Sequence, residues 1–412
     1  MTETNACRGC GAPLSQTLVD LGLSPLANSY VPLADAGKPE AKYPLHARVC
    51  EACWLVQVDD AVPADEIFKT EYAYFSSFSD SWLAHAKKYT EDMTARFQLG
   101  SDDLVVEVAS NDGYLLQYFV QAGIQVLGID PSGNVAAAAE EKGVPTIVDF
   151  FGEQLAIKLA GEGKKPSLIA SANVLAHVPD INDFVRGVAA FLQGDAVYTV
   201  EFPHLLHLIE QVQFDTIYHE HYSYLSLIAV EGVFARAGLR VFDVEQIPTH
   251  GGSLRVFACL ESSTRREEPG VETVRELERQ AKFDGLAGYD GFTEKVEAVR
   301  DGIVAFLATA KSEGKTVAAY GAAAKGNTFL NYCGIGNDQI AFCVDRNPAK
   351  QNTLLPGSQI PVHGVDVLYE RAPDYVLILP WNLKTEISSQ LSDLAAKGTR
   401  FVTAVPEVEV FT

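Results

Sequence analysis

Residues 104–114 read LVVEVASNDGY, and this stretch decides the fold. The valines predict a short buried strand, since β-branched residues favour strands. The small and turn-forming residues after them let the backbone pass close to a ligand before a helix begins near Tyr114. A second predicted strand, 125–129, ends at Asp130, and an acid about 20 residues after such a turn is placed to bind ribose hydroxyls. The stretch therefore predicts a Rossmann-like unit for a nucleoside cofactor.

The composition is that of a globular protein with more than one domain. The chain has 412 residues, of which 47% are hydrophobic and 21% charged, enough for two or three domains with large cores. A formal net charge of −22 argues against binding a polyanion over a broad surface, although a local basic pocket can still hold one diphosphate. Membrane-spanning and signal segments are not evident. We expect a cytoplasmic protein without nucleic-acid or membrane partners.

Two C-x2-C pairs near the amino terminus predict a metal centre. They offer four soft ligands for a tetrahedral structural zinc: Cys7, Cys10, Cys50 and Cys53. A reducing compartment favours zinc over two disulfides or four free thiols. The long stretch between the pairs must form a small lobe of its own. The aromatic segment after it is either a linker, which the sequence favours, or a lid that offers Tyr72 or Tyr74 to a substrate.

Strand and helix signals alternate from residue 81 to about 260, which predicts a mostly parallel sheet covered on both faces. Seven strands with a closely spaced last pair match class I methyltransferases that use S-adenosylmethionine. The first turn offers only Gly113 of the three glycines in the dinucleotide fingerprint, so NAD is disfavoured. The predicted strands are 104–108, 125–129, 145–148, 167–170, 196–200, 240–245 and 254–260.

The cofactor should bind at the carboxyl ends of these strands. Asp149 can accept the adenine amino group while Phe150 or Phe151 stacks on the base. His177, beyond the fourth strand, is either a site residue or an ordinary residue at a helix start. The other expected cofactor contacts are Glu107, Ala109, Asn111, Asp112, Gly113, Asp130, Pro131, Ala172 and Asn173.

The most unusual stretch is residues 214–224, FDTIYHEHYSY. A metal cluster of His219, Glu220 and His221 is a weak candidate, because adjacent side chains point apart in most backbones and the H-E-x-x-H spacing is absent. Proton transfer fits better, because an imidazole takes a proton near neutral pH and a nearby carboxylate orients it. A purely structural role is the third interpretation.

The polar residues 261–269 mark a domain boundary. A second strand, turn and helix unit follows, with strands at 316–320, 340–344 and 375–379. It is either a scaffold or a wall for a nucleotide diphosphate, with Gly321, Ala323 and Lys325 around the phosphates at a helix start. The spacing that predicts a long helix before this unit is that of Phe292, Val296, Val299, Ile303 and Phe306.

With these motifs the whole chain resembles the sugar C-methyltransferases of deoxysugar biosynthesis, which install a methyl branch at C-3 of a nucleotide-linked 4-keto sugar. One departure is Ala109, where the family usually has glycine. The motifs are the cysteine pairs, PLAN (25–28), YAYF (72–75), SNDG (110–113), AHVPD (176–180), EFP (201–203), residues 214–221, HGGSLR (250–255) and YGAAAKGN (320–327).

The resemblance implies a mechanism and a substrate. His221 would take the C-3 proton, with Glu220 as its orienting or substrate-binding partner, and donors would hold the enolate oxygen at C-4. Tyr218, Tyr72 and His177 would line the sugar pocket or stabilise the oxyanion. The nucleotide would be dTDP, and the further substrate contacts would be Tyr74, Tyr222, Lys325, Asn327 and Asn382.

We therefore expect an α/β protein of three domains, as a monomer or a weak dimer. These are a zinc-binding domain (1–68), a central class I methyltransferase domain with a Rossmann-like seven-stranded sheet (69–260), and a second Rossmann-like domain that contributes to nucleotide-sugar binding (261–412). One alternative is a zinc-containing methyltransferase for another small molecule, RNA or protein, and the acidic charge disfavours RNA. The other is a binding module that keeps the fold without the chemistry.

Overall fold

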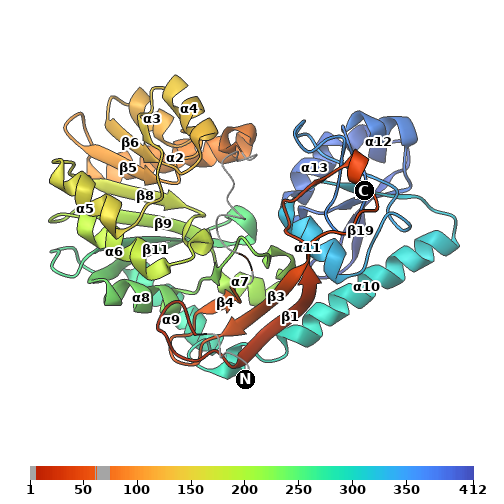
Figure 1. The fold of residues 1–412 in the computed structure, drawn as a ribbon, viewed down its shortest axis with the longest axis horizontal. Coiled ribbons are helices and arrows are strands. Elements are labelled where there is room, and N and C mark those ends of the chain that lie inside the picture. Colours follow the sequence, from red (N-terminus) through yellow and green to blue (C-terminus); the bar gives the residue numbers. More distant parts are fainter. Residues whose placement is uncertain (1–5, 61, 63–74) are drawn as a thin grey trace.

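The computed structural model describes residues 6–60, 62 and 75–412, which form three units (Figure 1). A four-stranded sheet carries the cysteine lobe, a seven-stranded sheet forms the middle unit, and a six-stranded sheet forms the carboxyl-terminal unit. The expected lid residues Tyr72 and Tyr74 lie outside the described residues. None of the helices in the described ranges is both long and apolar enough to cross a membrane.

The middle sheet has the strand order β11-β12-β9-β8-β5-β6-β7. Strand β12 is antiparallel to both of its neighbours, whereas the strands from β9 to β7 are parallel. This topology confirms the predicted class I methyltransferase fold. The strands are β5 (Leu104–Val108), β6 (Gln125–Ile129), β7 (Thr146–Ile147), β8 (Leu168–Ala172), β9 (Val197–Pro203), β11 (Leu239–Ile247) and β12 (Ser253–Leu260).

Two cores cover the faces of this sheet, because successive side chains of a strand point to opposite faces. Val105 of β5 packs with α2, α3 and α4, whereas Val106 and Val108 pack with α5, α6 and α8. The helices are α2 (Asp80–Phe97), α3 (Leu116–Gln121), α4 (Gly133–Glu141), α5 (Glu153–Gly161), α6 (Ile181–Phe191), α7 (Leu205–Glu210), α8 (Leu227–Arg236) and α9 (Pro269–Gln280).

Helix α9 packs on the middle unit, although it follows the domain boundary expected at residue 261. Its apolar residues Val271 and Val274 belong to the core of the middle sheet. Its Glu278 accepts hydrogen bonds from the backbone N–H groups of Leu227 and Ile228 at the start of α8. The physical boundary therefore lies beyond α9, and the sequence signal at 261 marks only a surface loop.

The carboxyl-terminal unit has the strand order β16-β14-β13-β17-β18-β19, which is parallel except for β19. Helix α10 (Phe292–Ser312) buries the residues whose spacing predicted it, except that Phe306 is only partly buried. The strands are β13 (Val317–Tyr320), β14 (Cys343–Val344), β16 (Val362–His363), β17 (Tyr375–Ile378), β18 (Arg400–Thr403) and β19 (Glu409–Phe411). The remaining helices are α11 (Ala324–Tyr332), α12 (Asp366–Arg371), α13 (Lys384–Gln390) and α14 (Ser392–Ala395).

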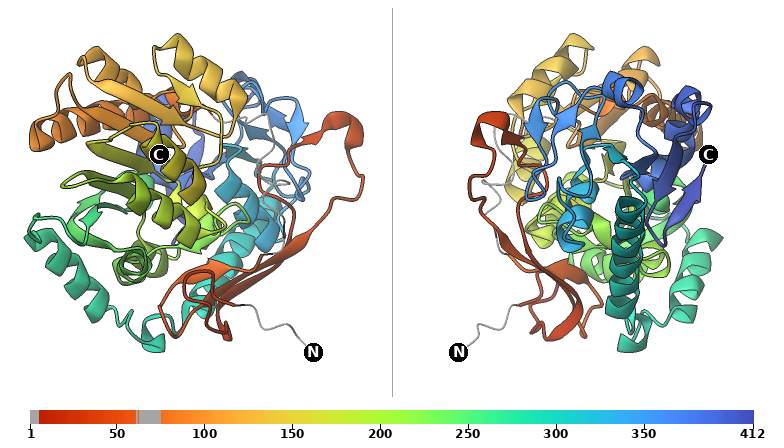
Figure 2. Two further views of the ribbon diagram at one scale, coloured as in Figure 1. Left: turned by 60° about the vertical axis from the view of Figure 1, so that its left-hand side comes forward. Right: turned by 90° about the vertical axis from the view of Figure 1, so that its right-hand side faces the viewer.

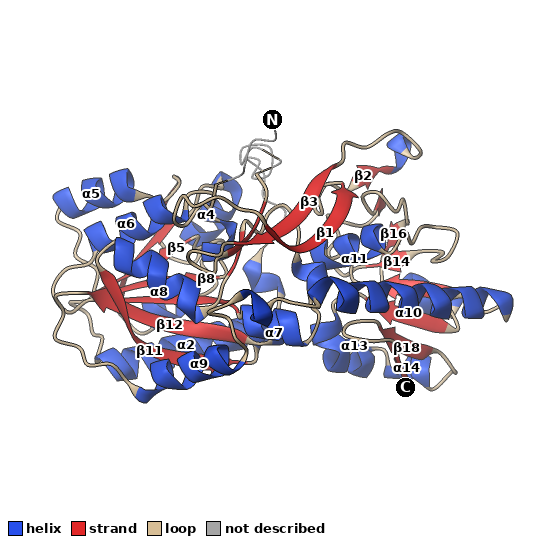
Figure 3. Cartoon of the chain, turned by 90° about the horizontal axis from the view of Figure 1, so that it is seen from below, coloured by secondary structure: helices blue, strands red, loops and turns tan. Residues whose placement is uncertain are grey.

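The cysteine lobe joins the two larger units rather than standing alone (Figure 2). Its strands β1 (Gln16–Ser24), β3 (Tyr43–Val49) and β4 (Val56–Val58) are completed by β10 (Ser223–Tyr224) of the middle unit. Strand β2 (Val31–Pro32) pairs with β15 (Thr353–Leu354) of the carboxyl-terminal unit. The start of α10 lies beside β1 (Figure 3), where Thr293 donates a hydrogen bond to the Leu18 carbonyl at 3.1 Å.

Candidate active site

The turn after β5 is held in an unusual backbone conformation at the edge of the sheet. Ala109, Asn111 and Gly113 have φ angles of 56°, 48° and 73°, in a region that disfavours residues with a Cβ atom. The Asp130 carboxylate accepts hydrogen bonds from the N–H groups of Asn111 and Ser132, both at 2.9 Å. The acid at the end of β6 therefore fixes the turn, and burial raises its pKa.

The surroundings of this turn are acidic. Glu107 is fully buried, and its pKa is raised mainly by burial and further by the charges of Asp130 and Asp112. Asp112 is held by Lys142, whose Nζ lies 3.0 Å from the carboxylate and 2.6 Å from the backbone carbonyl. The turn therefore has three acidic side chains and one nearby lysine, and a cationic ligand would favour the charged forms of these acids.

The expected adenine contacts lie just beyond β7. Phe150 is 65% exposed, which is unusual for a large aromatic side chain, and Asp149 beside it is exposed as well. Phe151 instead packs against Phe184 of α6, with ring centroids 5.3 Å apart. A free ring at the carboxyl edge of a parallel sheet is suited to stacking on a base. Of the two rings, Phe150 is thus the one available to the cofactor.

His221 is a neutral imidazole with a defined tautomer. Its Nδ1 donates to the Thr216 carbonyl at 2.8 Å, because a carbonyl oxygen only accepts. Its Nε2 is therefore the acceptor, and the Tyr218 hydroxyl donates to it at 2.7 Å. Burial, assisted by the charges of His177 and Lys325, lowers the pKa of His221 well below its ordinary value. The ring thus carries an unprotonated nitrogen at neutral pH, as a general base requires.

His177 lies against this base. The ring centroids of His177 and His221 are 4.5 Å apart with the planes at 74°. Burial lowers the pKa of His177 to about 4, so both rings are neutral together. The structure thus brings together three of the residues predicted for the site: Tyr218, His177 and His221.

The neighbours of His221 point away from it. The Glu220 carboxylate accepts from Asn28 at 2.7 Å, so the Thr216 carbonyl orients the base. Glu220 stays a predicted substrate-binding residue. The Tyr222 ring packs under the Arg8 guanidinium at 5.0 Å. Tyr222 is therefore a packing residue of the cysteine lobe, which corrects its expected role as a substrate contact. The backbone explains these directions, because residues 218–221 form a turn in which the His221 N–H donates to the Tyr218 carbonyl at 2.9 Å. The turn brings His221 beside Tyr218 and away from its neighbours in the sequence.

The metal centre lies in the cysteine pairs. Within the described part of the chain, the group of side chains able to hold a metal is Cys7, Cys10, Cys50 and Cys53, with Sγ atoms all within 4.8 Å of one another. The Cys7–Cys53 and Cys10–Cys50 sulfur distances are both 3.6 Å. A tetrahedron with Zn–S bonds of about 2.3 Å has sulfurs about 3.8 Å apart, so these residues fit zinc.

Comparisons with known proteins cover all three units. A zinc binding domain family matches residues 7–68, a methyltransferase domain family matches 82–244, and a C-methyltransferase C-terminal domain family matches 248–406. The C-methyltransferase NovU of Streptomyces niveus is 36% identical over 406 residues, which are 98% of this chain and 96% of NovU. The chain belongs to the sugar C-methyltransferase family. It is an S-adenosylmethionine-dependent C-methyltransferase that binds zinc and acts on a small molecule.

Solved structures similar to this C-methyltransferase align with part of the chain. Magnesium protoporphyrin IX methyltransferase ChlM from Synechocystis PCC 6803, with bound SAH, is 15% identical, with a TM-score of 0.35, over 43% of this chain and 82% of its own. An S-adenosylmethionine-dependent methyltransferase from Clostridium acetobutylicum ATCC 824 is 11% identical, with a TM-score of 0.34, over 42% of this chain and 90% of its own.

The middle unit of this C-methyltransferase fits S-adenosylmethionine. Asp130 stands at the strand end where a ribose is bound in such sheets, and Phe150 offers an exposed ring nearby. The acidic turn suits the positive charge of a sulfonium. Ala172 and Asn173 end and follow β8, and the backbone N–H of Asn173 donates to the Glu201 carbonyl at 2.8 Å. Pro131 directly follows Asp130 and stays, with these residues, a predicted cofactor contact.

His250 is a site residue that the sequence reasoning missed. Its φ angle is 54°, which is rare for a residue with a side chain. Its Nε2 accepts from the Asn173 side chain at 3.1 Å, and its ring lies 5.3 Å from that of Trp82. Burial, then the charge of Lys325, lowers the pKa of His250 to about 4, so the ring is a third neutral imidazole. The HGG sequence was the available signal, because a histidine before two glycines indicates a constrained turn.

Lys325 brings the carboxyl-terminal unit of the C-methyltransferase to these imidazoles. Its Nζ donates to Asn382 at 2.8 Å and lies 4.6 Å from the centroid of the Trp381 ring. The Trp381 indole N–H donates to Asp215 at 2.7 Å, and burial raises the pKa of Asp215 to about 6. Asp215 is a second residue that the sequence reasoning missed. The charge of this lysine also contributes to the lowered pKa of His221 and of His250.

Asn327 is not available to a substrate. Its side chain is 1% exposed, and its Nδ2 donates to the Ala27 carbonyl at 2.7 Å. The residue ties α11 to the PLAN loop of the cysteine lobe, so its expected role as a substrate contact is corrected to one in packing. Its position two residues after Lys325 explains the error, because that spacing places the two side chains about 200° apart around the helix, and the sequence motif does not distinguish the two sides.

Proposed function

We propose that this C-methyltransferase adds a methyl group to C-3 of a dTDP-linked 4-keto deoxysugar, after taking the C-3 proton to form an enolate. The observation that carries the proposal is the neutral imidazole of His221, whose Nε2 is its unprotonated nitrogen. A carbon next to a ketone becomes a nucleophile once its proton is removed, and a general base must accept that proton. S-adenosylmethionine, when bound, supplies the methyl group that C-3 acquires.

The contacts of His221 suit it to this step. Its Nδ1–H stays on the Thr216 carbonyl as Nε2 takes the proton, so the positive charge that forms on the ring faces a fixed acceptor. The Tyr218 hydroxyl donates to Nε2, and when the sugar enters it can redirect this donor to the C-4 oxygen. A donor aimed at developing negative charge stabilises the transition state more than the ground state. His177, neutral and in ring contact with the base, is the second proposed donor.

The carboxyl-terminal unit supports a nucleotide diphosphate as the other part of the substrate. Helix α11 begins without a side-chain cap, so its first backbone N–H groups are open to an anion. Lys325 adds a cation in its first turn, and Trp381 and Asn382 lie beside that cation. Asp345 follows β14 as Asp130 follows β6, in the position that binds ribose hydroxyls in Rossmann-like units. Such an enzyme would serve the biosynthesis of branched deoxysugars.

The test is deuterium exchange at C-3 of a dTDP-4-keto deoxysugar in deuterated water. We expect the wild-type enzyme to exchange this proton, and His221→Asn to slow both exchange and methyl transfer by about 10²- to 10⁴-fold. The affinity for S-adenosylmethionine should stay the same, because His221 is not an expected contact of that cofactor. His363→Asn, in strand β16, is the matched control and should behave as wild type, because the His363 ring contacts Phe342 and not the imidazoles around His221. Full exchange by His221→Asn would assign the base to another residue.

A further inference from the structure

We infer that the zinc-binding lobe positions the catalytic base, and that Gln57 is the positioning residue that joins the zinc ligand Cys7 to the strand after His221. The inference rests on the proposed function, in which His221 is the base. It gives the lobe a role in the reaction in addition to stabilising the fold.

Gln57 connects the first cysteine pair to one short strand. Its Nε2 donates to the Cys7 sulfur at 3.1 Å, and its Oε1 accepts from the Arg8 N–H at 2.9 Å. The side chain is buried, at 1% exposure, so water does not compete for these bonds. Strand β4, which contains Gln57, directly follows the second pair at Cys50 and Cys53. A donor to a metal-binding thiolate orients the ligand and tunes the metal.

Strand β4 in turn holds the backbone that follows the base. Gln57 is paired with Ser223, and the Val58 N–H donates to the Tyr222 carbonyl at 3.2 Å. The Arg8 guanidinium covers the Tyr222 ring and donates to the Val58 carbonyl at 2.9 Å. The residues just after His221 are thus a strand of the same sheet that carries the zinc ligands.

The lobe also holds the two residues before the base. The His219 Nε2 donates to the Pro44 carbonyl of β3 at 3.1 Å, and the Glu220 carboxylate accepts from Asn28 at 2.7 Å. The lobe therefore fixes the loop on both sides of His221, whose own ring faces Tyr218 and His177. A displacement of a catalytic group by about 1 Å can cost 10²-fold in rate, so a loosened lobe should slow proton removal first.

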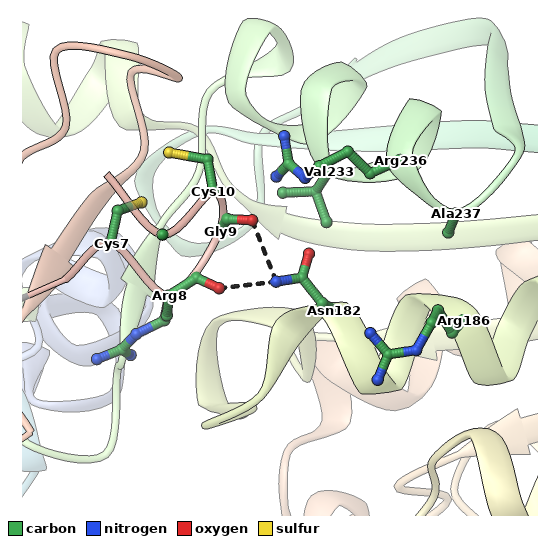
Figure 4. Close-up of a pocket in the computed structure, with 10 residues that line it drawn as sticks. Cys7, Arg8, Gly9, Cys10, Asn182, Arg186, Val233, Arg236 and Ala237 are labelled. Atoms are coloured by element: carbon green, nitrogen blue, oxygen red, sulfur yellow. Dashed lines mark hydrogen bonds between the residues drawn. The ribbon is translucent and has the colours of Figure 1, made fainter. Parts of the chain in front are cut away.

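The first cysteine pair is anchored to the cofactor-binding unit on its other side (Figure 4). Asn182, at the start of α6, donates to the carbonyls of Arg8 and Gly9 at 2.8 and 3.1 Å. A cavity of about 400 Å³ adjoins this contact and is lined in part by Arg186 and Arg236. The zinc-binding loop thus contacts α6 of the cofactor-binding unit on one side and β4, which pairs with the strand after the base, on the other.

The test compares two glutamine variants of the full-length enzyme. Gln57→Met keeps the volume of the side chain but removes both of its hydrogen bonds. Gln16→Met is the matched control, because Gln16 contacts Glu51 in the same lobe and does not contact β10. With zinc bound, we expect Gln57→Met to lower the maximal rate of C-3 exchange about 10- to 100-fold, with S-adenosylmethionine affinity within about twofold of wild type. The acid limb of its rate profile should shift to higher pH, since a misplaced imidazole regains its ordinary pKa. Gln16→Met should match wild type.

Two further measurements complete the test. His219→Leu removes the contact with β3 without touching a cysteine, and it should lower exchange by about tenfold with full zinc content. Zinc removal by a chelator should abolish exchange while S-adenosylmethionine binding persists. Wild-type exchange and pH profile in Gln57→Met, or in the zinc-free enzyme, would overturn the inference. A parallel loss of exchange and cofactor binding in Gln57→Met would also overturn it, because the whole fold is then affected. Persistent exchange in His221→Asn would instead remove the proposed function itself.

Discussion

The middle and carboxyl-terminal units share one architecture and differ in charge. In each, a central strand runs into a turn and a helix, and an acid follows the neighbouring strand: Asp130 after β6 and Asp345 after β14. Each acid accepts one N–H from the turn and one from the residue two positions after itself, at 2.7 to 2.9 Å. The two sites thus have the same frame, and any difference in ligand must come from the turns.

The two turns differ in the charge of the side chains around them. The first is lined by Glu107, Asp112 and Asp130, whereas the second is built of alanines and leads to Lys325 at the start of α11. An acidic turn suits a sulfonium cofactor, and a basic helix start suits a diphosphate. On the proposed function, one backbone frame serves a cationic and an anionic ligand in a single chain.

The largest effect is expected from removing either acid. Asp130→Asn should weaken S-adenosylmethionine binding by about 100-fold and leave nucleotide-sugar affinity unchanged, because a buried charged hydrogen-bond acceptor is worth about 1.5–3 kcal/mol. Asp345→Asn should weaken nucleotide-sugar binding and leave S-adenosylmethionine affinity unchanged. Calorimetric titration of each variant with each ligand measures all four affinities. The comparison fails if one variant weakens both ligands equally while the unfolding curve stays that of wild type.

A smaller effect is expected from removing Lys325, the lysine that gives the second turn a positive charge. Lys325→Met should raise the KM for the nucleotide sugar by about 10-fold, the value of one lost charge-assisted bond, and leave cofactor affinity unchanged. Steady-state kinetics with either substrate varied gives both values. Lys311→Met, which removes a surface lysine of the same unit paired with Asp338, is the control. An unchanged KM in Lys325→Met would place the diphosphate elsewhere.

The framework of this comparison could be predicted from sequence. The valine-rich strands, the turns and the acid at Asp130 are local patterns, since a strand and the turn after it are set by neighbouring residues. The zinc ligands could be predicted for the same reason, because C-x2-C spacing fixes two ligands at once. The structure confirms each of the seven predicted strands of the middle sheet, with their ends correct to within a few residues.

The details of the site could not be predicted, because they depend on contacts between distant segments. The direction of Glu220 and Tyr222 follows from the pairing of β10 with β4, and those strands lie far apart in the sequence. Asp215 accepts a hydrogen bond from Trp381, and His250 accepts one from Asn173. In both pairs the partner lies far away in the sequence. A residue list read along the chain gives the chemistry of the site but not the faces that the side chains occupy.

The comparison also predicts unequal acid sensitivity. The middle unit holds His177 and His250, whose pKa values are lowered by burial to about 4, while the carboxyl-terminal unit contains His363 alone. Between pH 6.5 and about 4 the unfolded chain binds protons at the three buried imidazoles that the folded middle unit does not. These imidazoles lower the free energy of unfolding as pH falls, by up to about 1.4 kcal/mol per pH unit per histidine. They outnumber Glu107 and Asp215, buried acids whose raised pKa values act in the opposite direction. Hydrogen exchange at pH 7 and pH 5 should show the middle unit opening first. Equal opening of both units would contradict this.

The smallest effect is expected when the alanine of the first turn and the glycine of the second are each replaced by the other residue type. These substitutions test the backbone conformation of the two turns. Ala109 has a φ angle of 56°, whereas the second turn has glycine at the equivalent place, Gly321, with a φ angle of 91°. Ala109→Gly should relieve about 1–2 kcal/mol of strain, less about 0.4–1 kcal/mol for the greater freedom of the unfolded chain, for a net gain of about 0.5 kcal/mol. Gly321→Ala should destabilise, because its Cβ would lie 2.5 Å from Pro380 Cδ. Denaturant unfolding at constant slope measures both changes. A loss of stability in Ala109→Gly would mean that the methyl group is itself packed in the first turn, and that the two frames differ in packing as well as in charge.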